Sequence, residues 1–464
     1  MILYVLALIL ITLPGCVMGP SYKKPEIKLP ANYSVQLNGE QKKDLACWWK
    51  VFADPQLEQL IEKGLCQNYD LQVALEKIEE SRNLNRIQIA NLFPQINSFA
   101  TTLKTNIPAS LPFNNITPLR NGPFSIIGMD TIWEIDIWGR LRRKQKSAEY
   151  QWIAQIEDMR DVAIILIADI AQTYITFCAL QKKIAITQEN GNIDKRILEL
   201  NTATFSSGLQ NRQVPLEQKT IFNQDTTQTI GFLIDQQVSY HKLAYLLGIT
   251  PDQLALDLTH IQNIPQPHHE IEIDKPYELL RRRPDIRKTE NLLAASYEDI
   301  GSAMAEWLPK ISLLGFLGKT FGPLTNVGKR ISRIWAVGPV FEWPLLDFGR
   351  IYFNIKAKES SQRQAALTYQ KAVINAVQEV ENWLVSYVEE KNRMYILQEK
   401  LTTENKRASL THDQFMSGIE AELTYLLSKK RMNDIENELI DSEQKVASNF
   451  IALYKALGGG WSYV

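Results

Sequence analysis

Residues 133–140 read WEIDIWGR, and the end of this stretch recurs as WPLLDFGR at residues 343–350. Up to Trp138 the run alternates apolar and acidic residues, which is the period of a β-strand with one apolar face. From Gly139 onward, GRLRRKQKSAEYQ has the composition of a charged helix. The pattern predicts a strand that passes into a helix without an intervening turn, at two places in the chain.

The chain carries an internal repeat with a constant offset. Three pairs of motifs match 210 residues apart: Gly139-Arg140 with Gly349-Arg350, the Phe-x-x-Gly that ends at Gly208 with the one that ends at Gly418, and Gly248 with Gly458. LFPQI (92–96) and WLPKI (307–311) add a fourth pair, whose offset has slipped by five residues. Agreement at one offset indicates that a structural unit has been duplicated.

Each half contains a segment with the composition of long helices. Residues 350–417 contain neither Gly nor Pro, and their apolar residues recur at intervals of three and four. One helix over this segment would be about 100 Å long. Helices of this length need partner helices, because propensity alone stabilises little. We therefore predict a long antiparallel hairpin in each half, with Gly208 or Gly418 at its tip.

Four extended runs lie between the helices, at about residues 94–104, 123–138, 309–320 and 333–348. Their apolar faces are predicted to carry Ile127, Met129, Trp133, Ile135 and Ile137 in the second run, and Trp335, Val337, Phe341, Trp343 and Leu345 in the fourth. A half-buried sheet in a soluble domain is the alternative. Strands of about ten residues with terminal Trp and a polar second face are, however, typical of outer-membrane barrels. Lipid tolerates no open sheet edge, and four strands cannot close a barrel, so the sheet is predicted to oligomerise.

Composition excludes several classes of protein. The formal net charge of -1 over 464 residues gives no basic excess for nucleic acid. The charged fraction of 22% and the mean hydropathy of -0.20 exclude a helical membrane protein with many spans. After residue 15, no segment has the roughly 20 uninterrupted apolar residues that a spanning helix needs.

The N-terminus has the form of an export signal. MILYVLALILITLPGC is an apolar run that ends in small residues and a cysteine. We predict a lipoprotein signal peptide at 1–15 and lipidation of Cys16, although Pro14 and the lack of a preceding Lys or Arg depart from the usual pattern. A plain secretory signal or a short anchor is the alternative. Cys47 and Cys66 either pair in an oxidising compartment or stay free thiols.

These signals predict the organisation of the chain. A signal peptide at 1–15 is followed by a lipidated extended segment at 16–50. The first structural repeat covers 51–248 and the second covers 275–464, and the Pro-rich stretch 249–274 connects them.

Together, the motifs resemble the outer membrane factor family of TolC-like channels, in particular its lipoprotein branch of the OprM or NodT type. The matching stretches are GPSYKKPEIKLP, WWKVFADPQLEQLIEKGLCQNYDLQVALEKIEESR, LFPQI, WEIDIWGR, RRRPDIRKTENLLAASYEDIGSAMAEWLPKI and PLLDFGR. The resemblance implies a mainly α protein with a transmembrane β-barrel, in which a homotrimer closes a 12-stranded barrel and the helices form a periplasmic tunnel.

The resemblance also implies a function in the bacterial outer membrane. We expect a passive exit channel of a tripartite efflux system, with a periplasmic adaptor (membrane fusion) protein and an inner-membrane transporter of the RND type as partners. Drugs or other small toxic compounds are the expected substrates. A type I secretion channel is one alternative, and a lipid-anchored periplasmic coiled-coil scaffold without a pore is another.

Candidate site residues follow from the resemblance and the patterns. The hairpin tips, Gly208-Leu209 and Gly418-Ile419, match the family's adaptor-docking motif. A periplasmic constriction is expected to use Glu217 with Lys430 or Arg431, because Leu427 stands where a family Asp is often found. The polar strand faces carry Asp130, Glu134, Asp136 and Glu342, which would make the barrel interior acidic. A solvated charged helix face, or ordinary exposure on a sheet, explains the same charges without function.

The sequence gives no sign of catalysis. The five His residues show no metal-site spacing, and neither a P-loop nor a G-x-G-x-x-G motif is present. We expect a protein that is not an enzyme and that carries no cofactor and no metal, apart from the covalent lipid on Cys16.

Overall fold

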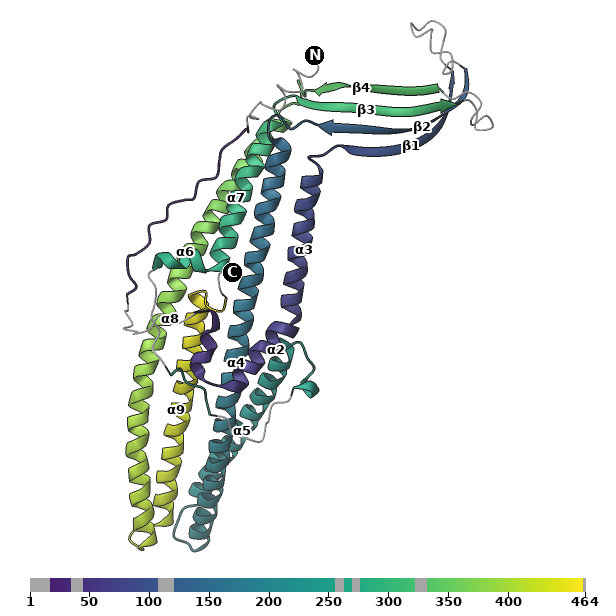
Figure 1. Ribbon diagram of the computed structural model, residues 1–464. Coiled ribbons are helices and arrows are strands. Elements are labelled where there is room, and N and C mark those ends of the chain that lie inside the picture. Colours follow the sequence, from purple (N-terminus) through teal and green to yellow (C-terminus); the bar gives the residue numbers. More distant parts are fainter. Residues whose placement is uncertain are drawn as a thin grey trace. The chain divides into compact units, whose positions relative to one another are not determined.

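The structure is a computed structural model that describes residues 17–34, 45–106, 121–254, 263–268, 276–321 and 332–461 (Figure 1). Its longer helices are α2 (Pro55–Gln67), α3 (Tyr69–Ala90), α4 (Arg140–Ser206), α5 (Gln213–Leu246), α7 (Pro284–Ala305), α8 (Arg350–Met416) and α9 (Glu422–Ala456). Shorter helices are η1 (Leu45–Phe52), η3 (Pro251–Gln253), η4 (Pro276–Glu278) and α6 (Leu279–Arg282). The strands are β1 (Gln95–Asn106), β2 (Asn121–Glu134), β3 (Lys310–Phe321) and β4 (Ser332–Glu342).

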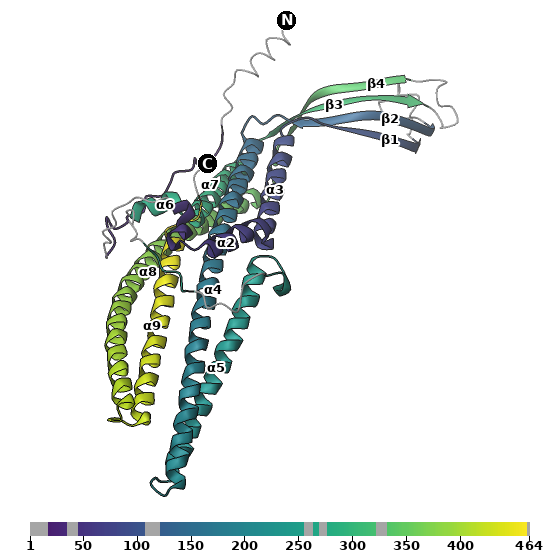
Figure 2. The same ribbon diagram turned by 60° about the horizontal axis from the view of Figure 1, so that its bottom comes forward.

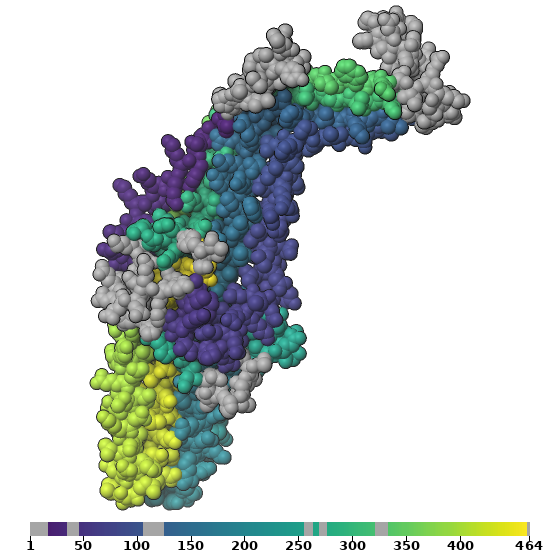
Figure 3. All heavy atoms as spheres, in the orientation of Figure 1, coloured from purple at the N-terminus to yellow at the C-terminus, as the bar shows by residue number. Residues whose placement is uncertain are grey.

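The chain divides into two compact units, and α3, α4, α7 and α8 contribute residues to both. The first unit comprises Met1–Glu26, Lys77–Ile156 and Lys288–Gln370 and contains the four-stranded sheet. Its strands follow the order β1-β2-β3-β4, and every neighbouring pair is antiparallel. Figure 3 shows the two strands of the second half, in green, directly beside those of the first half, in blue. Each half therefore supplies one hairpin, and the β2–β3 pairing joins them.

The strands end earlier than the sequence pattern predicts. β2 ends at Glu134 rather than near residue 138, and β4 ends at Glu342 rather than near 348. Ile135, Ile137 and Leu345 consequently lie outside the strands. Five residues separate β2 from α4, and Gly139 takes a left-handed φ of 78° just before the helix. The expected direct passage from strand to helix was wrong, because the chain bends here before the helix begins.

The second unit comprises Ile27–Glu76, Glu157–Arg287 and Lys371–Val464. Within it, α4 runs beside α5 and α8 beside α9, so that each half contributes one long hairpin (Figures 1 and 2). α4 and α8 each contain 67 residues. The core includes Tyr174 and Phe177 of α4, which are fully buried, and Trp48 stacks on Tyr454 with ring centroids 5.5 Å apart.

One described helix is apolar enough to cross a membrane by length and composition alone. A window of 18 residues in α4 has a mean hydropathy of 1.8, but 67% of it is buried inside the protein, a share that is usual for a core helix. Burial against other helices explains why α4 is so apolar.

Residues Leu45–Phe52 form η1, so the extended segment does not reach residue 50. Cys47 and Cys66 are free thiols. The predicted signal peptide, Cys16 and parts of the 249–274 connector lie outside the described residues.

Candidate functional site

One face of the sheet is apolar and exposed. Cross-strand partners point to the same side, and the registers align Met129 with Leu317 and Leu317 with Trp335. Met129, Leu317 and Trp335 are exposed by 56%, 63% and 72% in the chain. The same face also carries Ile96, Ile127, Val337 and Phe341, each more than half exposed. A continuous apolar face of this kind has the character of a lipid-facing surface.

The opposite face is mixed rather than polar. It carries Asp130 and Glu134, as predicted from the alternation, but also Ile132, which is 61% exposed. Phe99 and Phe316 approach each other across this face with ring centroids 5.7 Å apart. The expectation of a uniformly polar second face was too simple, because β1, β2 and β3 all contribute apolar side chains to it.

The carboxylates at the helix end of the sheet are neutralised. The Arg140 guanidinium donates to both oxygens of Glu134, at 2.8 and 2.6 Å. Asp136 lies beyond β2 and accepts the backbone N–H groups of Leu141 and Arg142, at 3.1 and 2.9 Å, so it caps the N-terminus of α4. A helix N-terminus favours a carboxylate at this position. Asp136 is therefore a capping residue rather than a strand residue.

A pocket at the same end of the sheet has a volume of about 570 Å³. Its charged lining consists of Glu134, Glu342, Arg140, Lys144 and Lys310. Two carboxylates thus face three cations, and Glu342 lies opposite Lys310 in the β3–β4 register. The prediction of an acidic interior does not hold for this end of the barrel, because basic residues from α4 and β3 offset the carboxylates.

The junction between β4 and α8 is capped in a similar way to the junction between β2 and α4. The Asp347 carboxylate accepts the backbone N–H groups of Gly349 and Ile351, at 3.0 and 2.8 Å. The hydrogen bond from Ile351, together with that from Gly349, lowers the pKa of Asp347. Phe348, between Asp347 and Gly349, has a left-handed φ of 52° and a side chain that is 97% exposed.

The two hairpin tips share one backbone geometry. The N–H of Gly208 bonds to the carbonyl of Phe205, and that of Leu209 to the carbonyl of Thr204, which is a Schellman motif. Gly418 bonds to Phe415 in the same way, and both glycines have a φ of 72°. Only glycine adopts this conformation without strain. The residues that follow, Leu209 and Ile419, are exposed by 80% and 75%.

Near the tips, one lysine joins three helices. Lys430 of α9 donates to Asp194 of α4 at 2.6 Å and to Asp225 of α5 at 2.9 Å. The side chain of Asp194 is 1% exposed, and those of Lys430 and Asp225 are 18% and 17% exposed. Gln218 of α5 also donates to Asp194, at 3.0 Å. The expected pairing of Lys430 with Glu217 is replaced by this link.

The other residues of the predicted constriction are more exposed. Glu217 is exposed on α5. Arg431 has a side chain that is 62% exposed and lies 3.4 Å from Glu404. The structure therefore separates Lys430, which is held inside the unit, from Glu217 and Arg431 on its surface.

Burial changes the proton affinity of this cluster. Burial, and then the neighbouring Asp225, raise the pKa of Asp194 to about 6, against the opposing effect of Lys430. Burial also raises the pKa of Asp434, one turn along α9 from Lys430, while Lys430 lowers it. Burial opposes the charge of Lys430, but its bonds to Asp194 and Asp225 outweigh this and raise its pKa.

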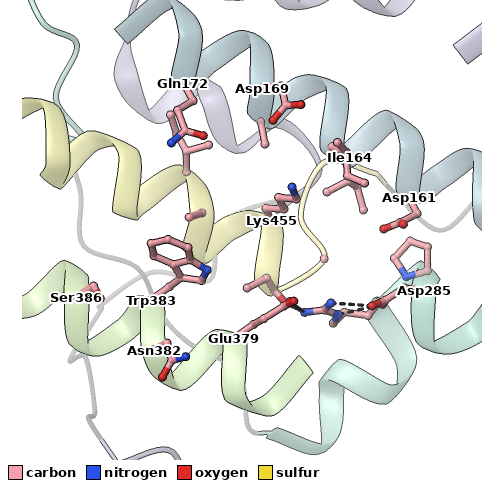
Figure 4. Close-up of a pocket in the computed structure, with 18 residues that line it drawn as sticks. Asp161, Ile164, Asp169, Gln172, Asp285, Glu379, Asn382, Trp383, Ser386 and Lys455 are labelled. Carbon is pink, nitrogen blue, oxygen red and sulfur yellow. Dashed lines mark hydrogen bonds and ion pairs between the residues drawn. The ribbon is translucent and has the colours of Figure 1, made fainter. Parts of the chain in front are cut away.

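A larger cavity, of about 720 Å³, lies between α4, α8 and α9 and the start of α7 (Figure 4). Arg283 forms one side of it and donates to Asp285, Glu379 and the carbonyl of Ala456, at distances between 2.7 and 3.0 Å. The charge of Arg283 is thus satisfied by two carboxylates. Figure 4 shows Lys455 between Trp383 and Asp161, so that the lining carries both signs of charge.

A buried ion pair fastens the N-terminal segment to the first unit. Arg143 of α4 donates to Glu298 of α7 at 2.8 Å and to the carbonyls of Gly19 and Pro20 at 3.3 Å. The side chains of Arg143 and Glu298 are 8% and 6% exposed. Gly301 permits the close approach, because a Cβ there would lie 2.8 Å from the Met18 carbonyl oxygen. Residues 17–20 are therefore held beside α4 and α7.

These contacts were missed by the sequence analysis. Asp194, Asp225 and Lys430 are far apart in the chain, as are Arg143 and Glu298, and no local pattern connects them. The residues that share a helix face with Asp194, namely Asn190, Ile197 and Asn201, are both polar and apolar, so the sequence carried no local signal of a buried partner.

Within the described residues, no group of three or more His, Cys, Asp or Glu side chains has the arrangement of a metal site. The long hairpins and the sheet with an exposed apolar face are instead the components of an outer-membrane channel with a helical tunnel and a β-barrel.

The comparisons with known proteins place the chain in a family. The model of the outer membrane efflux protein family matches residues 60–249 and 276–459, and the chain belongs to this family. The solved structure of the outer-membrane channel OprN is similar, with a TM-score of 0.84 and 28% sequence identity over 96% of this chain and 100% of that chain.

Two curated relatives are similar over nearly their whole lengths. Nodulation protein T of Rhizobium leguminosarum bv. trifolii is 26% identical over 97% of this chain and 96% of that protein. SrpC of Pseudomonas putida, a solvent efflux pump outer membrane protein, is 26% identical over 98% of this chain and 97% of its own. These similar proteins include an efflux pump outer membrane protein and an outer-membrane channel, which fits the expectation that the chain is not an enzyme.

Proposed function

We propose that the chain is the outer-membrane exit channel of a tripartite efflux system. It would passively conduct substrates that a periplasmic adaptor and an inner-membrane transporter, of the RND type, deliver to it. The observation that carries the proposal is the exposed apolar face of the sheet. In each half of the chain, the strand hairpin of this sheet is followed by one long helical hairpin. Membership of the outer membrane efflux family favours this function over a scaffold without a pore.

The proposed assembly is a homotrimer. The described sheet contains four strands, and its outer edges belong to β1 and β4. An open edge is costly in lipid, and the smallest barrels contain eight strands. Three copies would close a barrel of 12 strands. The proposed anchor is a lipid on Cys16, and its support is that the next residues, 17–20, are bound beside α4 and α7.

The hairpin tips are the proposed docking points for the adaptor. Leu209 and Ile419 are exposed apolar residues that follow the turn glycines Gly208 and Gly418. Exposed apolar side chains on a rigid turn provide a contact that a partner protein can bury. For the periplasmic constriction, the exposed charges of Glu217 and Arg431 remain the proposed lining, whereas Lys430 acts within the unit.

Small toxic compounds, including drugs, are the proposed substrates, and the relationship to a solvent efflux protein supports this class. A type I secretion channel is the second candidate. The transporter, rather than the exit channel, would select the substrate, so purification of the partners bound to the tips distinguishes the two systems.

Two neighbouring residues of β4 test the membrane assignment. Val337 lies on the exposed apolar face, opposite Gly315, whereas Ala336 lies on the other face, opposite Phe316. An arginine on the lipid face costs about 2–4 kcal/mol at the centre of the bilayer. We expect Val337→Arg to reduce insertion into lipid vesicles and to abolish most channel events in planar bilayers. Ala336→Arg should insert normally and change only the conductance.

If Ala336→Arg blocked insertion and Val337→Arg did not, the two faces of the sheet would have been assigned the wrong way round. If both variants inserted equally and neither conducted, the result would contradict a channel. Normal insertion is checked by protection of the sheet from protease in reconstituted vesicles.

The tips give a separate prediction. We expect the double variant Leu209→Asp/Ile419→Asp to lower adaptor binding at least tenfold while leaving conductance and thermal stability unchanged, because both side chains point into solvent. Binding is measured by surface plasmon resonance with the periplasmic adaptor that co-purifies with this chain. The matched control is Leu216→Asp, an exposed leucine on α5 beyond the turn. If Leu216→Asp lowered adaptor binding equally, the hairpin tips would not be the specific contact.

A further inference from the structure

The exposed apolar face of the sheet carries two basic residues near the end that is opposite to its helices (Figure 1). The registers align Ile127 with Lys319 and Lys319 with Arg333. Side chains two residues apart on a strand point to the same side. Lys319 therefore shares its face with Leu317, and Arg333 shares its face with Trp335. Two cations thus stand side by side on the face that has the character of a lipid-facing surface.

The charges of the four strands are divided unequally between the two faces. The apolar face carries three cations and no carboxylate, and these cations are Lys104, Lys319 and Arg333. The other face carries every acidic residue of the strands together with one lysine, namely Asp130, Glu134, Glu342 and Lys310.

The pair has no carboxylate to bind at its own end of the sheet. The sequence contains neither Asp nor Glu from residue 95 to 129 or from residue 310 to 341. Among the residues that the structure describes, neither Lys319 nor Arg333 forms an ion pair, and both side chains are exposed. The chain itself therefore leaves both charges without a counter-charge.

This arrangement is unfavourable unless an anion from outside the chain takes part. Residues that lie directly opposite each other on neighbouring strands have Cβ atoms about 4.5–5.5 Å apart, and like charges at this distance repel. A cation on the lipid face of a barrel is costly near the middle of the bilayer and much less so at its border. An anionic group at the border of the lipid would relieve the repulsion between Lys319 and Arg333.

The position along the strand fits such a border. Arg333 and Phe341 share the apolar face and are eight residues apart on β4. This spacing is about 27 Å along the strand, or roughly 20 Å of height at the tilt of barrel strands, whose apolar band is about 25 Å tall. Trp335 lies beside the pair, and aromatic residues form girdles at both borders of this band.

A pocket of about 740 Å³ adjoins the two cations. Lys319 and Arg333 line it together with Ile127, Met129 and Leu317 of the apolar face. These three apolar side chains are each more than half exposed. The pocket therefore combines apolar surface with two positive charges, which is the combination that an acyl chain joined to an anionic headgroup requires.

We infer that Lys319 and Arg333 bind a phosphate group of lipopolysaccharide in the outer leaflet of the membrane, and that its acyl chains cover the apolar part of the pocket. Arginine binds phosphate through paired N–H groups, and lysine binds it as a point charge. Lipopolysaccharide presents phosphate groups directly beside several acyl chains. The inference rests on the proposed channel, in which the helices are periplasmic and the opposite end of the sheet faces the exterior. It adds the class of lipid and the residues that bind it.

Native mass spectrometry of the purified full-length protein tests the site. The protein is incubated in mild detergent with bis-phosphorylated lipid A, the phosphorylated and acylated part of lipopolysaccharide. We expect Lys319→Gln/Arg333→Gln to reduce the bound fraction at least tenfold. Lys319→Arg/Arg333→Lys keeps both charges and should retain most of the binding. The matched control is Lys310→Gln, which removes a lysine from the same strand on the other face and should bind lipid A as the wild type does.

Two further lipids test the chemistry of the ligand. Lipid A without its phosphate groups should bind at least tenfold less than the bis-phosphorylated form, since its acyl chains alone cannot satisfy the cations. Equal binding of the two forms would overturn the inference, as would equal binding of bis-phosphorylated lipid A by the wild type and the double glutamine variant. Equal binding of phosphatidylglycerol would show a surface for anionic lipids in general and would overturn the assignment to lipopolysaccharide.

Conductance in planar bilayers separates this site from the proposed function. The double glutamine variant should insert and conduct as the wild type does, because it removes charge from the lipid face and leaves the other face unchanged. A conducting wild type that does not retain lipid A would overturn the inference and leave the channel intact. A wild type that neither inserts nor conducts would overturn the channel, and the lipid site with it.

Discussion

Replacing Lys430 with methionine is expected to destabilise the helical unit by about 3 kcal/mol at pH 7.5, because breaking a buried ion pair leaves uncompensated charge. Asp194 and Asp225 both bind Lys430 and are 1% and 17% exposed. Without the ammonium group, two carboxylates on different helices would face each other with little water to screen them. The thermal midpoint of the helical circular dichroism signal measures the loss. A midpoint within one degree of the wild type would contradict a stabilising link.

Asp194→Asn is the matched control and carries the dependence on pH. Burial raises the pKa of Asp194 to about 6, above its ordinary value of 3.8. The folded state therefore holds a proton more tightly than the unfolded state does. The associated stability is complete below about pH 3.8 and is lost as the pH rises to about 6. Asparagine imitates the protonated carboxyl group and leaves Asp225 to pair with Lys430.

We therefore expect Asp194→Asn to be tolerated at pH 7.5, where Lys430→Met is not. Between pH 4.5 and pH 7, the stability of the wild type should fall more than that of Asp194→Asn. Burial also raises the pKa values of Glu436 and Glu443, and these residues are present in both proteins. The readout is therefore the difference in stability between the wild type and Asp194→Asn at each pH. Parallel pH profiles for the two proteins would show that Asp194 does not titrate in this range.

The sequence predicted the repeated architecture because its signals are local. Glycine is needed where the backbone turns left-handed, so the positions of Gly208 and Gly418 located the ends of the hairpins. Alternation located the strands and their apolar face, since side chains on a strand have a period of two. Each of these features is fixed by a few neighbouring residues and could be read without knowledge of the tertiary structure.

The ends of the strands and the charge partners were not predictable in this way. Asp136 and Glu134 belong to one alternating run, yet Asp136 caps α4 and Glu134 binds Arg140. Alternation continues through both residues and gives no sign that the strand has stopped. The partners of Lys430 lie 205 and 236 residues away. Their pairing depends on how three helices pack, and a charged residue alone does not reveal which helix faces it.

The N-terminal segment provides the second large effect. Arg143→Met is expected to destabilise the first unit by roughly 3–5 kcal/mol, because Glu298 would remain buried without its partner. The same change removes both hydrogen bonds to the carbonyls of Gly19 and Pro20. Trypsin should then cut the bond after Lys23 several times faster than in the wild type, because the bond after Lys24 precedes Pro25 and resists trypsin. Mass spectrometry of the released peptide measures this rate.

The control is Glu290→Gln in α7, where the side chain contacts Lys24 of the same N-terminal segment. Glu290 binds Lys24 at 2.8 Å, but the Lys24 side chain is 49% exposed, and an exposed ion pair contributes less than about 1 kcal/mol. We expect little change in stability from this substitution.

The double variant Arg143→Met/Glu298→Leu separates the two roles of Arg143. Replacing both members of a buried ion pair with apolar residues often restores stability, so the thermal midpoint should recover toward that of the wild type. The carbonyls of Gly19 and Pro20 would still lack their donor, and rapid cleavage after Lys23 should remain. If stability and protection from trypsin recover together, the ion pair holds the helices but does not fasten the segment that follows Cys16. If only stability recovers, Arg143 itself binds that segment, and the position of the proposed lipid anchor depends on a side chain in α4.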